Sequence, residues 1–253
     1  MRSTGMALGG AAAAAGFGLL MWCGITTALL QLRPGGATAL SLIQGPGLLL
    51  GVLLAAGGSV ATHRTRPGRE RSRLLGLGAI LMAAALAVSL HVGLALRAPN
   101  AVGVAGVVLL LLAFGAIAAA SVVPDRTAPR VRPLQAPIQL LFAMATGLGL
   151  LYLLMEQRLG AAGDGRLMLT TLLGLGAVLA VCHVIDGRPG AARHRPVRAS
   201  RRGTRVPALL VAGPMLALLL SAWLPAMVSL AFATLTLLAA ALLDRTTAEH
   251  AAA

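Results

Sequence analysis

The chain has 253 residues, of which 58% are hydrophobic and 11% are charged, and its mean hydropathy is +0.87. This composition excludes a soluble globular domain, and the length suffices for several membrane spans of about 20 residues each. The formal net charge of +14 would suggest a nucleic-acid partner in a soluble protein, but here the charge lies in short gaps between apolar stretches, so we expect no nucleic acid.

Eight apolar stretches follow one another along the sequence, and nothing resembles the short alternating strands of a membrane barrel. Because a spanning segment must satisfy its backbone polar groups internally, each stretch is predicted to be a helix. The predicted helices cover residues 7–31, 40–62, 74–96, 101–123, 134–156, 167–187, 206–223 and 226–243. The fold class is therefore all-α, a polytopic integral membrane bundle of about eight transmembrane helices that forms one domain over residues 1–253.

Small residues and prolines predict how these helices pack and where they bend. Glycine and alanine dominate residues 9–18, and in lipid such residues allow close backbone approach. Pro46 is expected to kink the second helix and Pro214 the seventh, while Pro225 is expected to separate the last two helices as a hairpin turn. The polar tail over residues 244–253 is expected to be frayed.

The basic residues, all of them arginine, are sorted into every second gap. Fifteen of the 21 lie in residues 63–73, 124–133 and 188–205. The opposite gaps contain only Arg33, Arg97, Arg158 and Arg166. With an even number of crossings, the three basic segments and both termini share one face, which the positive-inside tendency makes cytoplasmic. We expect a multi-pass protein of the cell (inner) membrane.

The end of the second predicted helix has the residues best suited to chemistry. His63 is followed there by Arg66, Pro67 and Arg69. A histidine at a membrane boundary can hold or relay a proton near neutral pH, and guanidinium groups can hydrogen-bond a quinone carbonyl or an acidic partner. Residue types alone favour the simpler interpretation, a solvated basic loop that ends a span.

Other candidate residues lie inside the apolar segments. His91 and His183 are the imidazoles expected within the membrane, where they can ligate a haem or pass protons. We favour a hydrogen-bonded structural role for each. Cys23 and Cys182 lack a metal-binding spacing and are predicted to be buried thiols. No haem or metal is expected in this chain, and the absence of nucleotide-binding and hydrolase motifs predicts no catalytic centre of its own.

Four local stretches, in sequence order, resemble one family of membrane subunits. They are residues 15–20 (Ala-Gly-Phe-Gly-Leu-Leu), the His-x-x-Arg-Pro-x-Arg run at 63–69, residues 120–147 with Pro133-Leu134 and Pro137-Ile138, and the basic residues 188–205. This order is similar to that of the membrane anchor subunit of dimethyl sulfoxide reductase-type molybdoenzymes, which also has eight helices. Three features differ. Thr65 replaces the motif glycine, the aromatic and acidic residues expected just beyond it are missing, and so is the Tyr…Pro-x-Trp stretch after the fourth helix.

The resemblance implies an anchor that binds and oxidises menaquinol or ubiquinol. Its partners would be an iron–sulfur electron-transfer subunit and a molybdopterin catalytic subunit, in addition to the lipid bilayer. The quinol would bind near His63, Arg66, Pro67 and Arg69, with His63 as the proton acceptor. The arginines expected to dock the partner are Arg71, Arg73, Arg130, Arg132, Arg198, Arg201 and Arg202.

The resemblance and the arginine pattern disagree about sidedness. In the family the histidine end of the second helix faces exported subunits, whereas the arginine pattern places it in the cytoplasm. Either the basic segments dock an acidic iron–sulfur partner, or the complex faces inward. Two other functions fit the composition, namely a small-solute or ion transporter with proline-interrupted spans and a non-catalytic membrane assembly factor.

Overall fold

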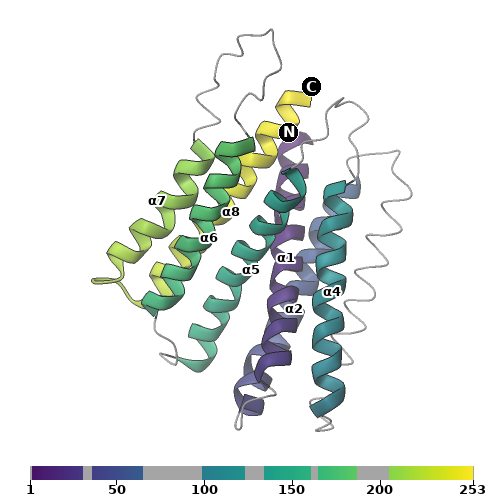
Figure 1. Ribbon diagram of the computed structural model, residues 1–253, viewed down its shortest axis with the longest axis vertical. Helices are drawn as coiled ribbons and strands as arrows, with labels where there is room; N and C mark the ends of the chain where they lie inside the picture. Colours follow the sequence, from purple (N-terminus) through teal and green to yellow (C-terminus); the bar gives the residue numbers. More distant parts are fainter. Residues whose placement is uncertain are drawn as a thin grey trace.

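The computed structural model describes residues 2–30, 36–64, 99–122, 134–160, 165–186 and 205–252. The helices are α1 (Arg2–Leu30), α2 (Gly36–Arg64), α4 (Pro99–Val122), α5 (Gln135–Leu159), α6 (Gly165–Asp186), α7 (Arg205–Leu220) and α8 (Ala226–Ala252) (Figure 1). The all-α prediction is confirmed for these residues. Seven of the eight predicted helices are present, and the one predicted over residues 74–96 lies outside the described residues.

Five of these helices are long and apolar enough to cross a membrane. The qualifying segments are Ala7–Leu29, Leu42–Thr62, Gln135–Leu159, Gly165–Asp186 and Ala226–Thr246. The apolar stretches found in α4 and α7, Val102–Ala118 and Arg205–Leu220, are shorter. Large apolar side chains such as Leu53, Leu111 and Leu235 lie exposed on the outside of the bundle. A surface of this kind is suited to lipid and is rare on soluble monomers.

The helix boundaries follow the sequence prediction closely except at the C-terminus. The predicted hairpin before α8 is confirmed, because α7 ends at Leu220, α8 begins at Ala226, and a Cβ atom on Gly213 of α7 would overlap the Thr236 side chain of α8. Pro46 and Pro214 lie inside α2 and α7, which continue past them. The prediction of a frayed tail is wrong, since α8 extends to Ala252. Residues 244–252 contain no glycine or proline and are rich in alanine, so nothing in them stops the helix.

Contacts made by α1 show how its neighbours run. Gly9, near the start of α1, lies against Ala61, near the end of α2. Gly24, near the end of α1, lies against Gly106, in the first half of α4. Both α2 and α4 are therefore antiparallel to α1, and they are parallel to each other.

The helices α5 and α6 also run in opposite directions. The ring of Phe142, early in α5, contacts that of His183 late in α6, and the hydroxyl groups of Tyr152 and Thr171 hydrogen-bond at 3.0 Å, so α5 and α6 are antiparallel. Figure 1 shows both chain termini at one end of the bundle, which we call the termini end. The helices α2, α4 and α6 all end there. These are the helix ends that precede the three basic segments.

The tightest packing joins α1 to α5. A Cβ atom on Gly18 would overlap the backbone carbonyl of Ala143, and one on Gly147 would overlap the backbone of Gly18. The indole Nε1 of Trp22 donates a hydrogen bond to the Met144 carbonyl oxygen at 2.9 Å. Backbone-to-backbone approach of this kind is how helices gain packing energy in lipid.

We expect Gly18→Ala to lower the free energy of unfolding by about 1–3 kcal/mol, because the added methyl group overpacks a contact whose opposing atoms are backbone. Gly115→Ala on α4 is the matched control, since a Cβ atom there meets nothing within 4 Å. Denaturant titration in detergent micelles measures both. Equal effects of the two substitutions would contradict the packing account.

Candidate functional site

The structure describes only one part of the predicted quinol site. His63 lies in the last turn of α2, at the termini end. Arg66, Pro67 and Arg69 lie outside the described residues. So do the arginines predicted to dock the partner, namely Arg71, Arg73, Arg130, Arg132, Arg198, Arg201 and Arg202. The structure therefore places the helix end that leads into this site, and the site residues themselves stay predictions.

A histidine–aspartate pair lies between α6 and α8 near the termini end. The Nε2 atom of His183 is 3.8 Å from Oδ1 of Asp244, and the two side chains are 13% and 30% exposed. That distance is too long for a hydrogen bond, and the buried Nε2 has no other hydrogen-bond partner. The imidazole also contacts Phe142 of α5 edge-on, with ring centroids 5.5 Å apart.

Arg245, which follows Asp244 in α8, contacts the start of α1. The Arg245 guanidinium covers Gly10, where a Cβ atom would overlap Nη1. Asp186 ends α6 one turn beyond His183, so α6 and α8 bring an imidazole, two carboxylates and a guanidinium to the termini end, beside the start of α1. Asp186, Asp244 and Arg245 each take part in further contacts.

The sequence predicted a hydrogen-bonded structural role for His183, but its Nε2 atom makes no hydrogen bond, and the nearby Asp244 was not predicted. Asp244 was assigned to the tail because the apolar run ends just before it, although the residues that follow favour helix. Within the described residues, no three His, Cys, Asp or Glu side chains lie close enough to hold a metal ion. Cys23 is a buried free thiol as predicted, and Cys182 is free and half-buried. His91 lies outside the described residues.

A second polar feature lies deep between α1 and α2, and the sequence analysis did not single it out. The Thr27 hydroxyl donates to the Cys23 carbonyl oxygen at 2.6 Å and accepts from Nε2 of Gln44 at 2.7 Å. Because the single hydroxyl proton goes to Cys23, Gln44 must present its amide nitrogen to Thr27, which fixes the orientation of the amide. Its Oε1 atom is then buried without a hydrogen-bond partner. Gln44 is 2% exposed, and Pro46 follows it by two residues.

No protein-family model, curated protein or solved structure matches this chain. The functional assignment therefore rests on its own residues, namely the helix ends at the termini end, the His183–Asp244 pair and the Thr27–Gln44 pair.

We expect His183→Phe to leave the free energy of unfolding within about 1 kcal/mol of the parent protein. The phenyl ring keeps the contact with Phe142 and removes a buried nitrogen atom that makes no hydrogen bond. His183→Ala, which also removes the ring, should cost about 2 kcal/mol or more. Denaturant unfolding in detergent measures both variants. If His183→Phe destabilises as much as His183→Ala, the attraction between His183 and Asp244 is what stabilises the fold.

Proposed function

We propose that this chain is the membrane anchor subunit of a respiratory molybdoenzyme of the dimethyl sulfoxide reductase type. In this role it binds and oxidises menaquinol or ubiquinol and passes electrons to an iron–sulfur partner subunit. The observation that carries the proposal is that α2, α4 and α6, the helices that precede the three arginine-rich segments, all end at the termini end. The ordered resemblance over residues 15–20, 63–69 and 120–147 supplies the family.

The arginine distribution supports docking of an acidic partner at the termini end. Fifteen of the 21 arginines belong to segments attached to this end. A concentration of one charge sign attracts a partner of the opposite sign from a distance and fixes its orientation. Guanidinium groups also bind carboxylates in a bidentate geometry that lysine does not match. Arg198, Arg201 and Arg202, which lie just before α7, are proposed as part of this docking surface.

The quinol is proposed to bind beside the end of α2. Oxidation of a quinol to a quinone releases two protons and two electrons. His63 is the proposed acceptor for one hydroxyl proton, the other proton passes to water at the membrane boundary, and Arg66 and Arg69 orient the oxygen atom that gives its proton to His63. The electrons pass to the nearest cluster of the iron–sulfur partner, so this chain needs no haem. His63 lies in the last turn of α2.

Eight membrane crossings are part of the proposal. The parallel directions of α2 and α4 support one crossing between them, and the intervening sequence contains one long apolar stretch, over residues 74–96. The proposed topology has eight crossings of the cell (inner) membrane. The positive-inside tendency puts the termini end in the cytoplasm.

We expect the double charge reversal Arg201→Glu and Arg202→Glu to reduce co-purification of the iron–sulfur partner by at least tenfold at low salt. Each reversal replaces an attraction with a repulsion at the docking surface. Arg158→Glu with Arg166→Glu is the matched control, because these arginines lie at the opposite end, close to the turn between α5 and α6. Pull-down with a tag on this chain, followed by iron determination, measures the effect. Equal losses in both double variants would exclude docking at the termini end.

We expect His63→Ala to assemble with its partner and to lose most of the quinol-dependent reduction of the terminal acceptor, since the proton acceptor is absent. Electron transfer from an artificial donor that reduces the partner directly should be unchanged. The ratio of the two activities in membrane vesicles is the measurement. A normal ratio would refute the assignment of His63.

The buried amide of Gln44 favours one alternative, a small-solute transporter. An acceptor oxygen without a hydrogen-bond partner, close to a proline within a span, is the kind of group that binds a solute inside the membrane. Uptake of a solute by the purified chain alone in liposomes, lost in Gln44→Leu, would establish this function and displace the anchor proposal.

A further inference from the structure

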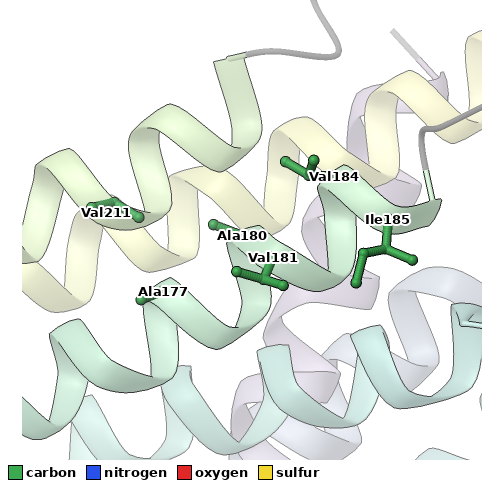
Figure 2. Close-up of a pocket in the computed structure, with 6 residues that line it drawn as sticks. All are labelled: Ala177, Ala180, Val181, Val184, Ile185 and Val211. Carbon is green, nitrogen blue, oxygen red and sulfur yellow. The ribbon is translucent and has the colours of Figure 1, made fainter.

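An apolar groove lies on the outer surface of the bundle between α6 and α7. Its volume is about 540 Å³, and its lining residues are Ala177, Ala180, Val181, Val184, Ile185 and Val211 (Figure 2). All six side chains are apolar. Val181, Val184 and Ile185 are exposed, whereas Ala180 is buried.

The groove is a consequence of one tight contact and the small side chains beside it. At Gly176 a Cβ atom would overlap the carbonyl oxygen of Leu210, so α6 and α7 touch there through backbone. The groove begins at the next residue, Ala177, and continues along α6 to Ile185. The methyl groups of Ala177 and Ala180 leave space that larger side chains would fill.

The length of the groove matches one leaflet of a bilayer. Eight residues separate Ala177 from Ile185, a rise of about 12 Å along an α-helix. The hydrocarbon core of a bilayer is about 30 Å thick, so one leaflet contributes about 15 Å. A spanning helix would need a groove of twice this length. The dimensions suit a chain that enters from the termini end and stops near the middle of the membrane.

An exposed arginine begins the helix that forms the other side of the groove. Arg205 begins α7 six residues before Val211, about 9 Å along the helix toward the end where α6 finishes. Its side chain is exposed. Asp186, which follows Ile185 at the end of α6, is half-buried, whereas Arg205 is exposed. An anionic group at this mouth can therefore meet the guanidinium group of Arg205.

We propose that this groove binds one acyl chain of an anionic phospholipid whose phosphate group is held by Arg205. The acyl chain gains dispersion contacts with the six apolar side chains, and the phosphate accepts charge-assisted hydrogen bonds from the guanidinium group. Basic sites between helices at the cytoplasmic face are suited to such headgroups. A zwitterionic lipid fills the groove equally well, so the charge of Arg205 determines the preference. The inference requires a membrane and is independent of the proposed anchor function.

Native mass spectrometry of the detergent-solubilised chain tests the proposal, with phosphatidylglycerol and phosphatidylcholine of identical acyl chains as probes. The parent chain should retain phosphatidylglycerol about fivefold more strongly per site, the effect of about one basic residue near an anionic headgroup. R205Q should abolish this preference, and A177L, which fills the groove, should reduce binding of both lipids. R158Q at the opposite end and V178L, which lies outside the groove lining, are the matched controls and should behave as the parent.

Three results would overturn the proposal. The first is equal retention of both lipids by the parent chain, and the second is a preference for phosphatidylglycerol that survives R205Q. The third is a dimer of the parent chain that disappears in A177L, because that result would show that a second copy of the chain occupies the groove. Loss of lipid preference in R205Q with normal partner binding would leave the anchor proposal intact, so the two proposals fail separately.

Discussion

The structure depends on the close approach of α1 to its neighbours. In lipid, no hydrophobic force draws apolar helices together, so association must come from van der Waals packing and a few interhelical hydrogen bonds. The span in α1 is 67% buried, against 33–50% for the other four spans, which makes α1 the central helix of the bundle. Its glycines allow this position, because Gly16 meets the backbone of α2, Gly18 that of α5 and Gly24 that of α4.

This packing also determines where polar groups lie. Helices that alternate in direction around α1 bring the ends of α2, α4 and α6 to one end of the bundle, together with the start of α1 and the last turns of α8. Ionisable side chains near that end can reach the aqueous phase, which avoids the cost of charge in the bilayer. His183 and Asp244 meet there, whereas the buried Gln44 amide keeps its place inside the bundle through the neutral hydroxyl of Thr27.

Much of the fold follows from the sequence. The apolar runs and Pro225 predicted seven helices to within a few residues at most ends, because burial in lipid requires a long apolar run and a helix satisfies its own backbone. The end of α8 was missed because hydropathy falls at Asp244 while helix propensity does not. The residues that face His183 and Gln44 could not be predicted. They depend on how each helix is rotated about its axis, and helices rich in Ala, Leu and Gly on all sides do not specify that rotation. The quinol site at His63 was predicted from resemblance and stays a prediction.

The proposed topology requires that all three arginine-rich segments lie on the same face of the membrane. Single cysteines at Ser72, Thr127 and Ser200, introduced after replacing Cys23 and Cys182 with alanine, test it directly. A membrane-impermeant maleimide should label these three positions from one and the same side of sealed vesicles and should label a cysteine at Gln157, near the end of α5, only from the other side. Labelling of any of the three basic segments from the same side as Gln157 would contradict the account.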